Sequence, residues 1–221
     1  MNIDTGKIEA IYNYVRAGTG PLNRADGLFV FGRADHLVAN RTAQLLGEGL
    51  ADYALIVGGI GKDSGPLTRL QIPESHYLAS LLVAEGVQGD KLYVESRPRN
   101  GGECCEMGLG KIVEERLPHE DMTVVIHPTS LKRIMAMLEH KAPQLGFKTR
   151  WQGTGTHYTF DSRRLIDQKE AVAELLRLAD WPVNKDAAGN PDPWCAPQAD
   201  LPWELVNVAR AYSAAWKAER K

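Results

Sequence analysis

The sequence predicts an α/β protein built on an open, parallel sheet of about five strands, with helices on both faces. Short apolar runs recur along the chain, as is typical of strands buried on both faces. Segments with helical apolar periodicity separate one run from the next. The connections between them are short, so we expect right-handed crossovers and parallel strands.

Composition indicates a globular protein. The chain has 221 residues, of which 43% are hydrophobic and 24% charged, enough for one domain with a sizeable core. The net charge of -2 argues against a large nucleic-acid-binding surface. No apolar run approaches the ~20 residues of a membrane span, and the N-terminus lacks the apolar region of a signal peptide. We therefore expect a cytoplasmic protein without a membrane span.

The individual elements follow from local patterns. Apolar or alternating runs predict strands over residues 28–31, 53–57, 91–95, 122–126 and 147–151. Helical periodicity, with glycines or prolines near the ends, predicts helices over residues 3–17, 37–50, 73–86, 103–117 and about 130–139. A polar connection is expected over 63–71.

The pattern changes after residue 151. Residues 158–160 are expected to add a strand, and the capping-box spacing of Asp167 and Glu170 predicts a helix from 167 to 178. Residues 181–202, with five prolines, predict a long surface connection before a last helix over 203–216. We divide the chain into a body over residues 1–160 and a helical C-terminal extension over 161–221, packed on the same domain.

Polar groups follow four of the predicted strands. They are Arg33, the stretch 58–62, the stretch 95–103 and the stretch 127–130. The carboxyl ends of parallel strands lie along one edge of a sheet, where α/β proteins bind small ligands. The sequence therefore predicts a ligand site at this edge.

Positive groups and glycines could bind an anion there. The amides of Gly58 and Gly59 could face a phosphate or carboxylate, although a tight turn explains these glycines equally well. The guanidiniums of Arg33 and Arg41 suit bidentate binding, and the alternative for Arg41 is a surface salt bridge. Arg133, one turn into its helix, could reach a ligand or lie on a solvated helix face. Further positive charge comes from Lys62, Arg97 and Arg99.

Carboxylates and a histidine could carry acid–base chemistry. Glu95 and Glu103 could form a general acid/base pair, or each could be a structural surface residue. Glu74 could bind a polar group or only complement a helix dipole. His127 could act as an acid, a base or a phosphate contact, or hydrogen-bond a neighbouring loop.

No histidine has a second ligand at metal-binding spacing, so we expect no metal. The cysteines, Cys104, Cys105 and Cys195, suit reduced thiols better than a disulfide framework.

Over residues 25–147 the motifs resemble the YdcF/SanA-like family, known as domain of unknown function 218. The features are Gly32 ending the first strand, Arg41 in the next helix, Gly58-Gly59, Glu74 with Glu85-Gly86-Val87, Glu95-Ser96 followed by Asn100 and Glu103, and Arg133. The family's E-S-x-x-x-N-x-x-E pattern is the most specific of these. Near the fourth strand, Ile126-His127 replaces a threonine-serine pair and Ser130 replaces a histidine. Within the most specific motif Gly101 replaces a threonine, and directly after it Cys104 replaces an asparagine.

The resemblance implies a Rossmann-like domain with a charged pocket, and S-adenosylmethionine binding has been proposed for one branch of the family. Our interpretation is a protein that binds a small anionic or nucleotide-like ligand, with hydrolysis or transfer at a phosphate as its enzymatic version. The alternatives are a non-catalytic sensor of S-adenosylmethionine or a nucleotide and, less favoured, a methyltransferase. We expect one pocket lined by Gly58, Gly59, Glu95, Asn100, Glu103 and Arg133, with Arg33 and His127 at its rim.

Overall fold

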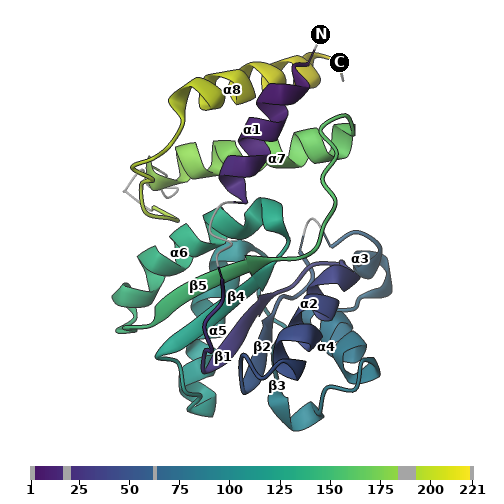
Figure 1. Ribbon diagram of the computed structural model, residues 1–221, viewed down its shortest axis with the longest axis vertical. Coiled ribbons are helices and arrows are strands. Elements are labelled where there is room, and N and C mark those ends of the chain that lie inside the picture. Colours follow the sequence, from purple (N-terminus) through teal and green to yellow (C-terminus); the bar gives the residue numbers. More distant parts are fainter. Residues whose placement is uncertain (1–2, 17–20, 62–63, 184–192, 220–221) are drawn as a thin grey trace.

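The computed structural model describes residues 3–16, 21–61, 64–183 and 193–219. Within them, five parallel strands form one open sheet in the order β3-β2-β1-β4-β5 (Figure 1). The strands are β1 (Gly27–Phe31), β2 (Tyr53–Val57), β3 (Leu92–Glu95), β4 (Asp121–Ile126) and β5 (Arg150–Gly155). This confirms the predicted fold class.

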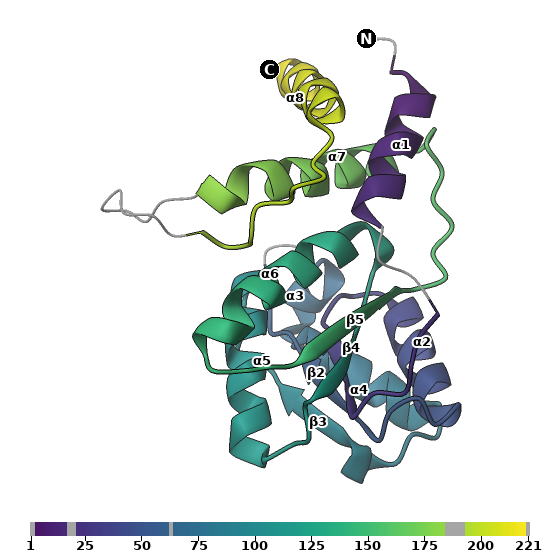
Figure 2. The same cartoon turned by 60° about the vertical axis from the view of Figure 1, so that its left-hand side comes forward.

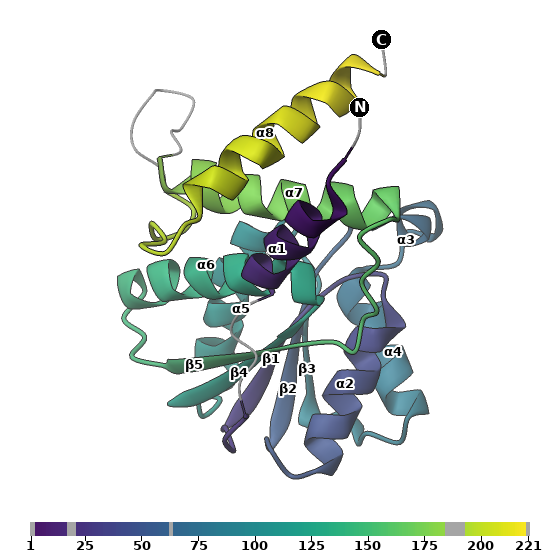
Figure 3. The ribbon, with the colours of Figure 1, turned by 45° about the horizontal axis from the view of Figure 1, so that its top comes forward.

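Helices cover both faces of the sheet. Successive strand residues point to opposite faces, and the residues on each face are apolar. Leu28 and Val30 of β1 pack in the core beneath α2 (His36–Gly47) and α4 (Glu74–Ala84). Phe29 and Phe31 pack in the other core, beneath α5 (Gly101–Glu115) and α6 (Leu131–Gln144). Every residue of β1 and β2 is buried, which explains their unbroken apolar sequences. The two pairs of helices lie on opposite sides of the sheet in Figure 3.

A third layer of helices lies above α6 (Figure 2). It consists of α1 (Thr5–Val15), α7 (Leu165–Asp180) and α8 (Trp203–Ala218). Ile8 and Ile11 of α1 and Leu175 and Leu178 of α7 are fully buried in the same core cluster as α5 and α6. The N-terminal helix therefore packs with the C-terminal helices rather than on the sheet itself.

Several predicted elements differ from the structure. The connection over 63–71 contains a short helix, α3 (Pro66–Leu70), and the helix predicted from residue 103 begins at Gly101. The helix predicted to end near 139 continues as α6 to Gln144, which delays the last strand, so β5 starts at Arg150 rather than at 147. Residues 158–160 are not a strand, and Phe160 instead stacks on Tyr12 with ring centroids 3.8 Å apart.

Two predictions for the C-terminal region also need correction. Asp167 does not cap α7, which begins at Leu165; its carboxylate instead accepts hydrogen bonds from the Tyr158 hydroxyl and the Asp161 amide. The connection over 181–202 is not wholly at the surface, because Cys195 is fully buried. Residues 184–192 of this connection, and Lys62, lie outside the described residues. The described ranges also contain three short 3-10 helices: η1 (Gly89–Lys91), η2 (Pro128–Ser130) and η3 (Trp181–Val183).

The strand order fixes where a ligand site is expected. The chain runs outward from β1 to β2 and β3, then returns to place β4 on the other side of β1. The loops after β1 and β4 therefore diverge to opposite faces, which opens the crevice where open α/β sheets bind ligands. Arg33 follows β1 and His127 follows β4. Among the described residues, no helix is long and apolar enough to cross a membrane.

Candidate functional site

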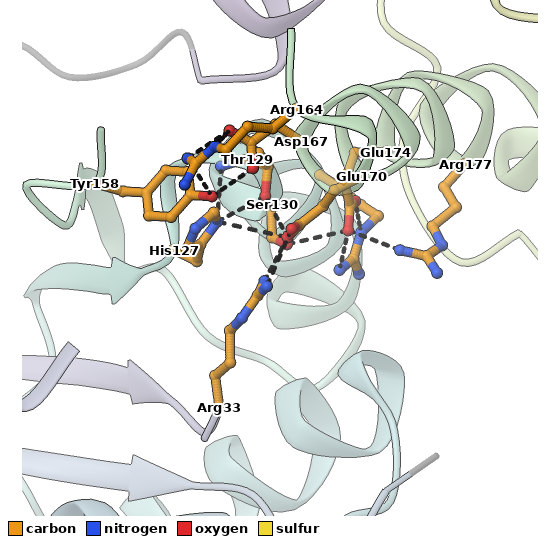
Figure 4. A network of polar contacts seen from close by, with 11 residues as sticks. Arg33, His127, Thr129, Ser130, Tyr158, Arg164, Asp167, Glu170, Glu174 and Arg177 are labelled. Carbon is orange, nitrogen blue, oxygen red and sulfur yellow. Dashed lines mark hydrogen bonds and ion pairs between the residues drawn. The ribbon is translucent and has the colours of Figure 1, made fainter. Parts of the chain in front are cut away.

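A network of polar side chains lies at the junction of β1 and β4 (Figure 4). Arg33 enters it from the loop after β1, and His127, Thr129 and Ser130 enter it from β4 and η2. Helix α7 supplies Glu170 to the same place. The network thus joins the carboxyl edge of the sheet to the helical layer above it.

Arg33 holds the carboxylate of Glu170 in its fork. Nη1 donates to Oε1 at 2.5 Å and Nη2 donates to Oε2 at 3.1 Å, the bidentate geometry that guanidinium also offers to phosphate. Burial acts to raise the pKa of Glu170, but Arg33 outweighs it and the pKa lies below its usual value. The Arg33 side chain remains 37% exposed, so solvent reaches part of it.

His127 is connected to the same carboxylate through Thr129. The Thr129 hydroxyl donates to Glu170 Oε1 at 2.8 Å, so its oxygen can accept from Nδ1 of His127 at 2.7 Å. The Thr129 amide approaches Nδ1 only to 3.4 Å, too long to compete. Burial, followed by the charge of Arg33, lowers the pKa of His127 to about 4. The imidazole is therefore neutral near pH 7, with the proton on Nδ1.

Tyr158 encloses His127 from the side. The two rings meet edge to face, with centroids 4.3 Å apart, and the phenol hydroxyl donates to Asp167 at 2.5 Å. Arg164 also holds Asp167 by an ion pair of 2.6 Å. These contacts fix the ring of Tyr158, which covers one side of His127.

Arg133 is used differently from Arg33. It is buried, and its Nε donates to Glu174 of α7, which also accepts from Ser130 at 3.0 Å and from Arg177 at 2.7 Å. Glu174 is only 2% exposed, and the surrounding face of α7 buries Val172, Leu175 and Leu178 at roughly 1.5–3 kcal/mol each. Displacing Glu174 would require lifting α7 away, so this ion pair acts as a clasp. Ser130 belongs to it.

Arg41 of α2 lies on the other side of the junction. Its Nε and Nη2 donate to the Thr154 hydroxyl at 3.4 and 3.3 Å, and Nη1 donates to Gln44 at 2.7 Å. In the described part of the chain no carboxylate pairs with it, so the alternative of a surface salt bridge is not observed.

Glu95 is engaged within its own loop. It is 3% exposed and accepts from the Arg97 amide at 3.0 Å and from the Arg97 side chain at 2.9 and 2.5 Å. The hydrogen bond from the Arg97 side chain lowers the pKa of Glu95 below its usual value, against the effect of burial. Glu95 is thus an ionised partner of Arg97, on the edge strand β3 and three strands away from β4.

Asn100 and Glu103 cap α5. The Asn100 side chain accepts from the Glu103 amide at 3.0 Å, while Glu103 accepts from the Asn100 side chain and the Arg99 amide, both at 2.7 Å. This reciprocal arrangement is close to a capping box. It accounts for the N-x-x-E part of the motif without a ligand.

The glycines pack the loop ends together. The amides of Gly58 and Gly59 donate to the carbonyls of Glu95 and Pro98, so both are already used. A Cβ at Gly32 would lie 2.9 Å from the Cβ of Glu74, and one at Gly58 would lie 2.9 Å from Gly32 Cα. Glu74, at the start of α4, thus fits beneath these glycines. The glycines permit close packing rather than forming an open phosphate cradle.

The structure therefore brings together Arg33 and His127, which we expected only at the rim, and adds Thr129 and Glu170. Of the expected pocket, Arg133 lies close to α5, since a Cβ at Gly101 would be 3.0 Å from its Nη1. Glu95, Asn100 and Glu103 are each bonded within the β3–α5 loop. Nothing in the local sequence marked Glu170 as a site residue, because the one pattern that included it was the capping-box spacing from Asp167.

No metal site is evident in the described residues, since they contain no group of three potential ligands. Two hollows lie away from the junction. One, of about 430 Å³, is lined by residues of α1 and of the stretch 159–163; the other, of about 180 Å³, lies between α7 and α8. Neither contains a residue of the Arg33–His127 network.

Comparisons with known proteins give a distant structural likeness and no family. No protein-family profile and no curated protein matches this chain. One solved structure to which it is similar is a protein in the NADB-Rossmann superfamily from Streptococcus agalactiae, with 16% identity and a TM-score of 0.35. The match covers 79% of this chain and 60% of that chain. The likeness is distant, and the Rossmann-like assignment rests on the observed strand order.

Proposed function

We propose that this protein binds a small ligand with a phosphate or carboxylate group at the junction of β1 and β4, and that Arg33 receives this group. The observation that carries the proposal is the Arg33–Glu170 contact. At the point where Rossmann-like sheets bind ligands, a partly exposed guanidinium already holds an anion in bidentate geometry.

The ligand exchanges with Glu170. Only the Glu170 side chain has to turn away, whereas α7 keeps its buried face and the Glu174 clasp. The Arg33 and Glu170 side chains are 37% and 18% exposed, and a phosphate, with more negative charge than a carboxylate, competes with Glu170 for the guanidinium. The hydroxyl of Thr129, released from Glu170, then donates to the ligand.

The packing of the loops narrows the ligand class. The amides of Gly58 and Gly59 bind carbonyls, and the first turn of α2 is capped by Asp35, whose carboxylate accepts from Leu37 at 3.0 Å. A dinucleotide pyrophosphate seated on these amides is therefore disfavoured. A compact anionic ligand, or the phosphate of a mononucleotide, suits the site better. S-adenosylmethionine, whose binding has been proposed for one branch of the YdcF/SanA-like family, is the alternative ligand.

A second candidate function is hydrolysis or transfer at a phosphate. The neutral imidazole of His127 donates through Nδ1, and no described residue hydrogen-bonds Nε2. Nε2 could accept the proton of a water or hydroxyl whose oxygen attacks phosphorus, while the bond to the leaving oxygen breaks. A pKa of about 4 makes His127 a weak base, so we place binding first.

Calorimetry with inorganic phosphate, AMP and S-adenosylmethionine tests the proposal. Arg33→Lys keeps the charge but loses the fork, so it should weaken binding of the preferred probe by about one to two decades, because a charge-assisted hydrogen bond contributes about 1.5–3 kcal/mol. The matched control is Arg24→Lys, which alters an exposed ion pair with Asp52 at the opposite edge of the sheet. Equal affinities in the two variants, or no binding of any probe by the native chain, would refute the proposal.

Glu170→Gln provides the complementary measurement. It removes the competing charge from the Arg33 fork, so the same probe should bind about tenfold more tightly than to the native chain. Asp180→Asn, in an exposed pair with Arg210 at the far end of α7, is the control and should leave affinity unchanged. Weaker binding in Glu170→Gln would mean that Glu170 assists the ligand instead of competing with it.

A further inference from the structure

We infer that Arg41, Thr154 and Thr156 form a second subsite, on the α2 side of the same sheet edge, which receives a second acidic group of the ligand. This inference rests on the proposed function and specifies its ligand as a molecule with two acidic groups, each phosphate or carboxylate. Arg33 would hold one group and Arg41 the other.

The first observation is the unpaired charge of Arg41. Arg33, Arg97 and Arg133 each donate from two nitrogens to one carboxylate. Arg41 is half-buried, and among the described residues it meets no carboxylate. Its Nε and Nη2, the pair that forms a fork, share a single hydroxyl oxygen at 3.3–3.4 Å, near the limit of hydrogen bonding. A bidentate anion would satisfy these two donors much better.

The second observation is a buried hydroxyl without a protein partner. Thr156 is only 7% exposed, and its Oγ1 bonds to no group in the described chain. Such a group costs about as much as a lost hydrogen bond, so a native chain that keeps one invites a functional explanation.

Strand register places the two threonines together. Thr154 pairs with Val125, whose side chain lies in the core beneath α2. The Thr156 amide donates to the Ile126 carbonyl at 3.2 Å, so the ladder continues past the end of β5. Side chains two residues apart share one face of a strand, so Thr156 points to the same side as Thr154, one step nearer the carboxyl edge.

The same register connects this subsite to Arg33. Ile126 pairs with Gly155, so Thr156 lies beside His127, which in turn is bonded to Thr129. The polar groups therefore run along the edge from Arg41 through the threonines and His127 to Arg33. One guanidinium and two hydroxyls suit an anion. The carboxylate of Asp35, the N-cap of α2, is held by its own helix.

Two probes that differ by one acidic group test this inference: 3-phosphoglycerate, which has a phosphate and a carboxylate, and glycerol 3-phosphate, which has the phosphate alone. Calorimetry of the native chain should give at least tenfold tighter binding of 3-phosphoglycerate. Arg41→Gln should abolish this preference while leaving the affinity for glycerol 3-phosphate within about twofold. An unchanged preference in Arg41→Gln would overturn the subsite.

Thr156→Val provides a test in which loss of folding cannot mimic the result. It removes a buried hydroxyl that has no partner, so the melting temperature should stay the same or rise, yet the preference for 3-phosphoglycerate should fall at least threefold. The matched control is Thr149→Val. Its Oγ1 is also buried without a partner, but it lies just before β5, at the opposite edge of the sheet. That variant should keep the preference.

The outcomes separate the two proposals. If Arg33→Lys weakens both probes but neither Arg41→Gln nor Thr156→Val changes their ratio, the anion site stands and the second subsite is wrong. If the native chain binds both probes equally, the subsite is also wrong. If it binds neither, both proposals fail for this class of ligand.

Discussion

At the scale of single residues, side chains of the same type have different roles because their surroundings differ. Arg33 and Arg133 both pair with a glutamate of α7, but Arg33 is 37% exposed at the side chain and Arg133 10%. Breaking the partly exposed pair leaves two groups that water still reaches in part, whereas removing one partner of the buried pair leaves a charge without compensation. Exposure therefore makes Arg33 a candidate for binding and Arg133 a structural residue.

His127 should make stability depend on pH between the pKa values of its folded and unfolded states. Its pKa is about 4 in the folded protein and near 6.5 in an unfolded chain, so between these values the unfolded state binds a proton that the folded state does not. The free energy of unfolding should therefore fall by about 2–3 kcal/mol from pH 6.5 to 4.5. Urea unfolding across this range measures it.

His127→Asn is the control for this experiment, since asparagine does not titrate, and its stability should vary much less over the same range. Glu170 and Glu174 do not confuse the result. Their pKa values lie below the ordinary 4.5, so their ion pairs lose stabilising effect only as the pH falls below about 4.5. An equal slope in the native chain and His127→Asn would contradict the assignment.

At the scale of secondary structure, the most specific sequence motif is explained by a helix terminus. Glu95 pairs with Arg97, and the Asn100 and Glu103 side chains satisfy amides and each other at the start of α5. Helix amides in the first turn have no partners within the helix, so a cap of this kind is favourable without any ligand.

Asn100→Ala should therefore destabilise the protein. Loss of an N-cap costs about 1 kcal/mol, which for a chain of this size lowers the melting temperature by about 2–4 °C. Asn100→Ser, which keeps an N-cap acceptor and places no second carboxylate beside Glu103, should retain most of the stability, and binding at Arg33 should not change in either variant. Weaker ligand binding with an unaltered melting temperature would instead favour the pocket that we expected from the sequence.

At the scale of the whole molecule, the helical layer is joined to the sheet domain by the clasp at Glu174. Arg133 of α6, Ser130 and Arg177 all donate to this one carboxylate. Helix α1 closes the layer from the other end of the chain, with Ile8 and Ile11 fully buried. The site at Arg33 therefore depends on α7 being held in place.

Glu174→Gln should lower the free energy of unfolding by about 3–5 kcal/mol, because Arg133 would stay buried without its counter-charge. Asp180→Asn, on the same helix but in an exposed pair, should change it by less than about 1 kcal/mol. Chemical denaturation of both variants provides the comparison. A small effect of Glu174→Gln would mean that apolar packing alone retains α7.

The sequence by itself determined the fold class and the edge on which polar groups gather. Strands buried on both faces need continuous apolar runs, and these are local features that a single sequence displays, as in β1 and β2. Arg33 and His127 were identifiable for the same reason, since each directly follows such a run. Boundaries were less well predicted: β5 moved because α6 runs longer than its periodicity indicated.

Only the tertiary structure decided which charges meet. Glu170 lies 137 residues from Arg33 in the chain, and the Thr154 hydroxyl lies 113 residues from Arg41. Contacts at such separation depend on strand order and on the packing of α7, which no local pattern encodes. Burial likewise depends on the tertiary structure. It lowers the pKa of His127, and it makes Arg133 a structural residue while Arg33 stays partly exposed. Local patterns thus located the edge of the sheet, and long-range packing determined the chemistry available there.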